Sequence, residues 1–390
     1  MRARTSVLLV LSLLALTASL RPVLRACCMV PRSYAGDVDQ SAQHVLVLHH
    51  DGHEELVLRV RPFFRGADAP PSSLAWLVTV PSVPTAYRTA SPEVFAAARS
   101  LHEKLRDLYE EQEPNPLVPN QLSKGLFMAA DAAPRSAISI GATITVGPYE
   151  ITPITALGAS AVDELNRYLG ENGFGEEEPD HLRWFAENEF TFLCIKITPP
   201  EGSTRLGDHL DLPPLQIGFD SERPYYPGMY SANQGDFGLE LTMLSSKPIS
   251  RRSVQDIGNC LRAVSSTPNL FTVKPLPEAF GSAVERAVSE DSDAPERWYL
   301  NRYDSYGVNP TLSDGRPAIS DWTEDIRWEL GGAADLPPDW YYGDGSRPLT
   351  HPNNLRTLLY VAVMASVLGL LLLFLRRRRA PPVEQGPRVE

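Results

Sequence analysis

The two ends of the chain carry apolar segments of unequal length, and these segments constrain where the rest of the chain can fold. Residues 357–375 form an uncharged run of 19 residues, followed at once by Arg376, Arg377, Arg378 and Arg379. At about 1.5 Å per residue, a helix of this length just crosses a bilayer. Four arginines resist translocation and stay in the cytoplasm. The pattern predicts a transmembrane helix over 355–375 and a cytoplasmic tail over 376–390.

The N-terminus predicts a secretory signal peptide over 1–26. Two arginines precede an apolar run over 6–20, which is short for a membrane span but fits the h-region of a leader. Cleavage after Ser19 or after Ala26 is compatible with the sequence, and an uncleaved anchor is the alternative. Residues 24–27 have the outline of a lipobox, so lipidation of Cys27 stays open. A leader followed by a stop-transfer helix predicts a single-pass protein of the cell membrane, with its main domain extracytoplasmic.

The net charge of the chain limits the classes of partner that it can bind. The formal net charge is −12, and it becomes about −19 for residues 27–375 once the eight arginines of the leader and tail and the net −1 of the last eleven residues are removed. Such a domain repels nucleic acid and anionic lipid headgroups as general partners. Cationic ligands and divalent ions remain possible, and solubility alone also explains the acidity. A protein or small-molecule ligand stays unidentified.

Four cysteines agree with export: Cys27, Cys28, Cys194 and Cys260. Neighbouring cysteines rarely bond each other, because the small ring strains the peptide. Either Cys194 pairs with Cys260, or the two N-terminal cysteines join the leading segment to the core. Four reduced, buried cysteines are the alternative.

Periodicity predicts an α+β domain over 27–275, with mainly antiparallel sheet and covering helices. Runs over 45–48 and 56–60 flank Asp51-Gly52, a signal for a hairpin with a type I′ turn. Further strands are expected over 74–80, 138–146, 148–157, 190–197, 215–219 and 238–244, and helices from Ser91, from Ser160, over 180–188 and from Ser253 through Val264. Several connections are too short for parallel crossovers.

Two regions depart from this pattern. Residues 111–136 contain four prolines and no period, so they predict a long loop or a domain boundary. Residues 276–353 hold four of the six tryptophans among Tyr, Pro, Asp and Gly. They predict a membrane-proximal extension, either packed on the domain or forming a stalk.

Several blocks resemble one bacterial family. They are ACCMVP (26–31), GDVDQSAQHVLVL (36–48), LAWLVTVPSVPTAYRTASPEVF (74–95) and VGPYEITPITALGASAVDELNRYLGENGF (146–174). In this order they resemble the exported bacterial proteins catalogued as Domain of Unknown Function 2330, with one departure at Thr79. The resemblance implies export and a shared domain, and it supplies no activity, cofactor or catalytic residue.

The segment HHDGHEE (49–55) raises the question of a metal site. In a two-residue hairpin His50 faces His53, and Glu55 follows on the same face. Two histidines and one carboxylate are a ligand set known for Zn or Fe. A turn tip offers little to orient such ligands, and the turn alone explains the polar residues. His50, His53 and Glu55 are therefore candidate ligands only, and no cofactor is predicted.

Other motifs are weaker. Acidic stretches over 290–296, 321–325 and 339–346 lack the ligand register of a calcium loop. Simple nucleophile and phosphate-binding motifs are not found, so no catalytic residue is named. PSVPTAYR (81–88) is either a stiff connection or a rigid recognition edge.

Three functions follow from the sequence. The first is a membrane-anchored extracytoplasmic binding or structural module. The second is an envelope enzyme, possibly assisted by a metal at the histidines. The third is a surface interaction module that uses residues 280–353.

Overall fold

The computed structural model describes residues 28–110 and 137–332, apart from gaps at 68, 159, 178, 208–209, 233–236, 258–260, 265–267, 273–274, 289–293 and 307–325. Within these residues no helix is long and apolar enough to cross a membrane. The predicted leader (1–26), the loop over 111–136, the span over 355–375 and the arginines at 376–379 all lie outside them.

The fold is mixed α+β with mostly antiparallel sheets, as predicted. The larger sheet has eight strands, which are β13 (Arg262–Ala263), β15 (Trp298–Tyr306), β12 (Gly238–Ser245), β2 (Asp37–His50), β3 (His53–Arg65), β10 (Leu215–Asp220) and β5 (Ala86–Thr89) in spatial order, with β14 (Leu270–Thr272) also on β15. One pair, β2 with β12, is parallel. Strand pairing between segments far apart in sequence therefore builds most of this sheet.

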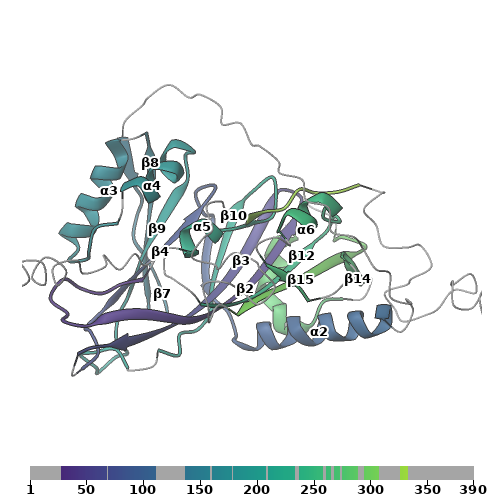
Figure 1. The fold of residues 1–390 in the computed structure, drawn as a ribbon, viewed down its shortest axis with the longest axis horizontal. Coiled ribbons are helices and arrows are strands. Elements are labelled where there is room, and N and C mark those ends of the chain that lie inside the picture. Colours follow the sequence, from purple (N-terminus) through teal and green to yellow (C-terminus); the bar gives the residue numbers. More distant parts are fainter. Residues whose placement is uncertain are drawn as a thin grey trace, which may run out of the picture.

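A second sheet of six strands lies beside the first (Figure 1). Its strands are β1 (Cys28–Met29), β4 (Leu74–Val80), β9 (Thr191–Ile197), β8 (Tyr149–Leu157) and β6 (Ala137–Ile140) in order, with β7 (Ile144–Val146) also on β8. Helices α3 (Ser160–Glu171) and α4 (Pro179–Glu187) pack against it. A short pair, β11 (Tyr225–Tyr226) with β16 (Ile326–Arg327), makes a third sheet, and α5 (Gly228–Ala232) follows β11.

The eight-stranded sheet has two buried faces. On one face, α2 (Glu93–Glu110) runs along the sheet, and η1 (Glu278–Phe280) and α7 (Gly281–Ala287) lie beside it (Figure 1). Val94 and Ala98 of α2 pack there against Leu46, Leu48 and related side chains. Val45, Val47 and Leu56 on the other face join the core shared with the six-stranded sheet. The alternation of side chains along β2 and β3 therefore feeds two separate cores.

The predicted hairpin is confirmed, and it is longer than expected. Strands β2 and β3 pair from His50–His53 at the turn to Asp37–Arg65 at the far end, with a bulge between Gln40 and Gln43. Asp51 and Gly52 have φ of 44° and 82°. Positive φ at both central positions is the signature of a type I′ turn, which Asp-Gly adopts at low cost. This local signal was readable because the turn and its strands are contiguous.

The helix predicted from Ser253 through Val264 is wrong at its C-terminal end. Helix α6 spans Arg251–Ile257, and the chain then forms β13, which pairs with β15. The Val264 amide donates to Arg302 O at 2.9 Å. An edge of β15 thus offers backbone partners that this segment's helical spacing does not reveal, and tertiary pairing overrides local propensity.

The eight-stranded sheet crosses the boundary predicted at residue 276. Strand β15 lies between β12 and the pair β13 and β14, and Leu300 and Tyr303 on it are 0% and 1% exposed. Trp328, also in the predicted extension, is fully buried, and its indole N–H donates to Tyr303 Oη at 3.3 Å. The described part of residues 276–353 is therefore packed within the domain.

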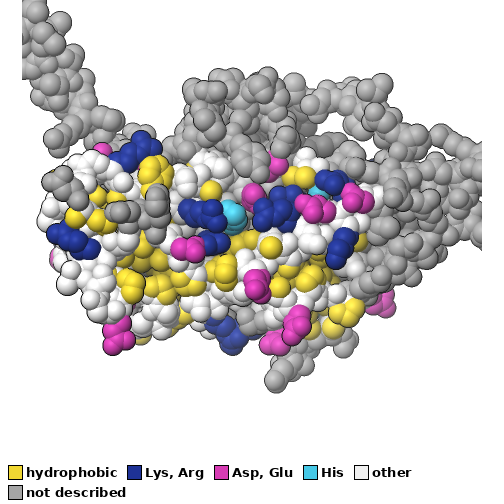
Figure 2. All heavy atoms as spheres, turned by 90° about the horizontal axis from the view of Figure 1, so that it is seen from below, with side chains coloured by type: hydrophobic (Ala, Val, Ile, Leu, Met, Phe, Trp, Pro, Cys, Tyr) yellow, Lys and Arg dark blue, Asp and Glu magenta, His cyan; other side chains and the backbone are white. Residues whose placement is uncertain are grey.

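Acidic side chains do not dominate every face of the protein. On the face along which α2 lies, basic, acidic and hydrophobic side chains are interspersed (Figure 2). Overall charge therefore does not by itself mark a ligand-binding surface there, and a site has to be argued from particular contacts.

Candidate functional site

The tip of the β2–β3 hairpin carries three histidines and two glutamates whose side chains alternate between the two faces of the sheet. His49 Nε2 lies 2.8 Å from Ser221 O, and Glu54 Oε2 accepts from the Tyr225 amide at 2.8 Å. These two residues are on one face. His50, His53 and Glu55 belong to the opposite face, because successive strand residues point to opposite sides. The predicted grouping by face is therefore confirmed.

His53 is held between two carboxylates. Its Nδ1 lies 3.2 Å from Asp220 Oδ1, and its Nε2 lies 3.2 Å from Glu55 Oε1. A carboxylate accepts hydrogen bonds, so this placement favours the form of the ring that carries a proton on both nitrogens. The hydrogen bond to Glu55 is the main cause that raises the pKa of His53, against the opposing effect of burial.

Glu55 is the buried centre of this network. It is 1% exposed, and its second oxygen, Oε2, accepts from Gln216 Nε2 at 2.7 Å. Gly218 pairs with Glu55 across β10 and β3, and a Cβ there would lie 2.6 Å from Glu55 Oε1. The glycine therefore leaves the space in which the carboxylate sits. The Glu55 carboxylate is therefore held by the Gln216 amide and the His53 ring.

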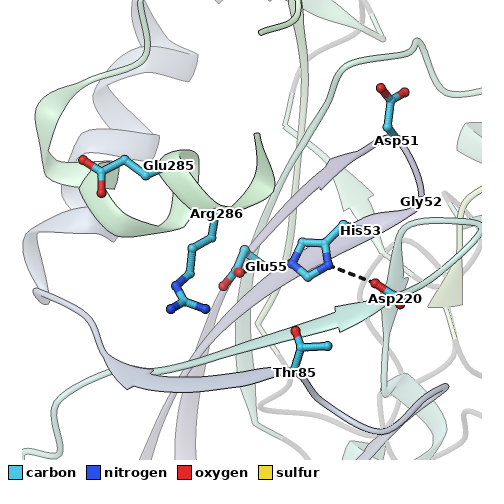
Figure 3. A pocket seen from close by; sticks show the side chains of 8 residues that line it. All are labelled: Asp51, Gly52, His53, Glu55, Thr85, Asp220, Glu285 and Arg286. Atoms are coloured by element: carbon cyan, nitrogen blue, oxygen red, sulfur yellow. Dashed lines mark hydrogen bonds and ion pairs between the residues drawn. The ribbon is translucent and has the colours of Figure 1, made fainter. Parts of the chain in front are cut away.

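These residues line a cavity of about 720 Å³, which we call the hairpin pocket (Figure 3). Its lining comes from four elements: the hairpin, the end of β10, the loop before β5, and α7. The residues are Asp51, Gly52, His53, Glu55, Asp220, Thr85, Glu285 and Arg286. Its volume falls within the range of small-molecule sites, roughly 300–1,000 Å³.

Arg286 is the one lining cation besides His53. Helix α7 contacts β2, β3 and β10, and this packing brings Arg286 over the network. Its guanidinium extends from the helix toward Glu55, on the opposite side of the pocket from Asp220 (Figure 3). Arg286 Nε is buried without a hydrogen-bond partner, and the part of the chain that the structure describes supplies no ion pair to this side chain.

The loop PSVPT closes the side of the pocket next to β10. Ser82 Oγ donates to Asp220 O at 2.7 Å, and the Thr85 amide donates to Gly218 O at 2.8 Å. Val83, between the two prolines, is 57% exposed. The predicted alternatives for this loop were a stiff connection and a recognition edge, and its position at the pocket is compatible with both.

The candidate metal ligands do not form one cluster. The structure brings His53 to Glu55, whereas His50 Nε2 has Asp51 Oδ2 as its nearest charged partner, at 3.5 Å. The His50 ring is 6.1 Å from that of Trp298, and neither of its nitrogens has a hydrogen-bond partner. Among the described residues, no group of three or more His, Cys, Asp or Glu side chains is arranged to hold a metal ion.

A second, smaller cavity of about 350 Å³ adjoins the tip on the side of His50. It shares Asp51 with the hairpin pocket, and Lys247, Glu296 and Tyr299 also line it. Lys247 Nζ is 4.0 Å from Asp51 Oδ1. Asp51 therefore lines both cavities at the turn.

Glu54, on the far face, is another buried acid. It is 0% exposed, its Oε1 has no hydrogen-bond partner, and burial raises its pKa well above the ordinary value. Burial therefore favours the neutral form of this carboxyl, which can still accept from the Tyr225 amide.

The remaining predicted site residues are placed as follows. Cys28 and Cys194 are buried free thiols, and burial raises the pKa of Cys194 to about 12. Cys27 and Cys260 lie outside the described residues, as do the acidic stretch over 321–325, the stretch over 339–346 and most of that over 290–296. The described residues show no disulfide at Cys28 or Cys194, and a pairing that involves Cys27 or Cys260 stays a prediction.

Sequence reasoning missed Asp220, Gln216 and Arg286. Asp220 lies 167 residues from His53, and Gln216 lies 161 residues from Glu55. The strand over 215–219 was predicted, but its pairing with β3 was not, and nothing in the sequence around Arg286 marks it. Knowledge that β10 pairs with β3 would have placed Asp220 and Gln216 at the site.

Comparison with known proteins places the chain in a family. Residues 22–329 match the family model described as "Uncharacterized protein conserved in bacteria (DUF2330)". The chain belongs to the DUF2330 family. The match extends past residue 174, where the last resembling block ends, and includes β15 and β16, so the family domain of this DUF2330 protein contains the strands of the predicted extension.

Comparisons with curated proteins and with solved structures give no further information about the function of this DUF2330 protein. No curated protein matches it. The crystal structure of baculovirus P35 is similar over 77% of this chain and 99% of its own, with 8% identity and a TM-score of 0.35. A TM-score this low does not establish a shared fold.

Proposed function

We propose that this DUF2330 protein is a membrane-anchored binding protein of the bacterial envelope, and that its ligand occupies the hairpin pocket. The observation that carries the proposal is the buried Glu55 charge at the pocket wall, held by His53 and Gln216. Buried ion pairs cost desolvation that their attraction often fails to repay. A network of this kind beside a cavity of ligand size is therefore better explained by recognition than by stability.

Binding is favoured over catalysis by the state of His53. Both of its nitrogens are engaged by carboxylates within the protein, so neither nitrogen is turned to a substrate or a metal. The Thr85 hydroxyl, which also lines the pocket, donates to Gly218 O at 3.2 Å. An interaction module built on residues 280–353 is less well supported, because β15 in that segment is a buried strand of the sheet.

The ligand proposal is tested with the full-length protein in a mild detergent. We expect a thermal-shift screen of small charged compounds to yield hits, because a ligand at 100 times its Kd stabilises by about 2.7 kcal/mol. Glu285→Trp, at an exposed position on the pocket rim, should abolish these shifts. Glu278→Trp is the matched control, since Glu278 is exposed on η1 and does not line the pocket. Hits that survive Glu285→Trp, or a screen without hits, would contradict the proposal.

The envelope location rests on the leader, the apolar run over 357–375 and the four arginines after it. We expect a phosphatase reporter fused after Glu390 to stay inactive in cells, because that enzyme needs the periplasm. The same reporter inserted between residues 353 and 354 should be active. Activity of the fusion after Glu390 would overturn the proposed orientation.

A further inference from the structure

We infer that the hairpin pocket recognises a zwitterion, a small molecule with one carboxylate and one ammonium group, such as a short peptide or an amino acid. This inference rests on the proposed function and names the ligand class for the same site. It follows from how the charges are distributed around the cavity, and each part of the distribution contributes separately.

The first part is the guanidinium of Arg286. It lines the pocket, its Nε is buried, and no described residue pairs with it. Buried donors in proteins are almost always hydrogen-bonded, and a buried donor without a partner is destabilising. A planar guanidinium matches a carboxylate through two parallel hydrogen bonds. A ligand carboxylate would satisfy this side chain.

The second part is the pair of aspartates across the cavity. Asp51 at the turn and Asp220 at the end of β10 lie on the other side of the pocket from Arg286 (Figure 3). Asp220 gives one oxygen to His53, and its side chain is 78% exposed. Asp51 is 55% exposed and has only long contacts, 3.5 Å to His50 and 4.0 Å to Lys247. Asp220 keeps an oxygen for an ammonium group, while the Asp51 carboxylate, which points away from Asp220 in Figure 3, adds negative charge at the rim.

The third part of the charge distribution is the middle of the pocket, between Arg286 and the aspartates. His53 and Glu55 neutralise each other, so the middle of the pocket presents little net charge to a ligand. The other lining acids, Asp51, Asp220 and Glu285, outnumber Arg286, so the pocket as a whole repels a purely anionic ligand and attracts an ammonium group. A purely cationic ligand would leave the Arg286 guanidinium unpaired, and a ligand that also carries a carboxylate would pair it. A molecule that carries both charges, separated along its length, matches both ends.

The test uses the full-length protein and a matched panel of probes, with affinity measured by calorimetry. The panel contains the dipeptide Ala-Ala, its N-acetyl form, its C-terminal amide, and 4-aminobutyrate and 6-aminohexanoate, which set other charge separations. We expect at least one zwitterion to bind, and loss of either charge from a binding dipeptide to weaken affinity at least tenfold.

Two variants test which end of the pocket binds which charge of the ligand. Arg286→Gln should remove the difference between Ala-Ala and its amide, and Asp51→Asn should reduce the difference between Ala-Ala and its N-acetyl form. Asparagine keeps the Asn-Gly type I′ turn, so the second variant preserves the hairpin. Arg167→Gln is the control, because Arg167 is exposed on α3 and pairs with Glu171 away from the pocket. If a different ω-amino acid is the better binder, the same comparison is made with its methyl ester.

The outcomes separate this inference from the proposed function. If the N-acetyl form or the amide binds as tightly as Ala-Ala, the zwitterion class is overturned. If no panel member binds while other screened compounds give shifts that Glu285→Trp abolishes, the ligand class is wrong and the pocket stands. If neither the panel nor the screen gives binding, both proposals fail together.

Discussion

Leu300→Asp is expected to destabilise the protein by about 3–5 kcal/mol, a large part of the roughly 5–15 kcal/mol that keeps a domain folded. Leu300 is 0% exposed on β15 and pairs with Leu244 of β12 and Leu270 of β14. An aspartate there would bury a charge without a partner. Urea denaturation followed by circular dichroism measures the loss. Leu300→Ala, at about 2–5 kcal/mol, keeps the effect measurable if the charged variant does not fold.

The matched control is the same kind of substitution at an exposed position inside the predicted domain over 27–275. Ile144 on β7 is 40% exposed, so Ile144→Asp should cost less than about 1 kcal/mol. If residues 276–353 formed a stalk, which was one of the two alternatives from the sequence, Leu300→Asp would instead cost little. If Leu300→Asp and Leu300→Ala both unfold at the wild-type urea concentration, β15 is not part of the core.

How much of the fold could be predicted depends on how local its signals are. Asp51-Gly52 and the apolar runs beside it sit within a few residues of each other, and both the turn and the facing of His50 to His53 followed from them. Strand β4 was predicted with its correct bounds, because Pro81 follows it directly. These elements are specified by neighbouring residues, which a single sequence displays.

Strand β15 was not predicted, for a physical reason. Its residues, WYLNRYDSY, mix aromatic, polar and charged side chains without a clean alternation. It is stabilised by pairing with β12, β13 and β14, which lie in other parts of the chain. Four tryptophans near prolines and aspartates suggested a loop-rich extension. The composition of a segment does not reveal that it is a buried strand when its pairing partners are distant in the sequence.

The candidate site shows the same division. Alternation along β3 correctly placed His53 and Glu55 on one face, and proximity between them is confirmed at 3.2 Å. Alternation could not reveal that Asp220 contacts the other nitrogen of His53. Among the described residues, the candidates His50, His53 and Glu55 are not arranged as one metal-binding group. The partners of a histidine, as well as its position, decide what it can bind.

The acid stability of the protein should be limited by two buried histidines. His49 and His102 are 2% and 0% exposed, and burial is the first cause that lowers the pKa of each to about 4. Both nitrogens of His102, on α2, lack hydrogen-bond partners. In the unfolded chain a histidine takes up its proton near pH 6.5. Between pH 6.5 and 4, the unfolded state therefore binds more protons than the folded state.

This difference sets the sign of the effect. Stability rises with pH wherever the unfolded state binds more protons, so each histidine weakens the fold as pH falls from 6.5 toward 4. A shift of one pKa unit is worth about 1.4 kcal/mol, so His102 alone is expected to cost on the order of 1–3 kcal/mol at pH 4.5. Glu54 and His53, whose pKa values are raised, act in the opposite direction.

His102→Leu isolates one of the two histidines, because the opposing groups are unchanged in the variant. At pH 7.5 the variant should be about as stable as the wild type, since an unpaired imidazole is exchanged for an apolar side chain. As pH falls to 4.5 it should become more stable than the wild type by about 1–3 kcal/mol. Urea denaturation at half-unit pH steps measures the difference, with Lys104→Leu, exposed on the same helix, as the control that should follow the wild-type pH dependence. A difference between His102→Leu and wild type that stays constant from pH 7.5 to 4.5 would show that His102 takes up its proton equally in both states, and burial would not control the titration.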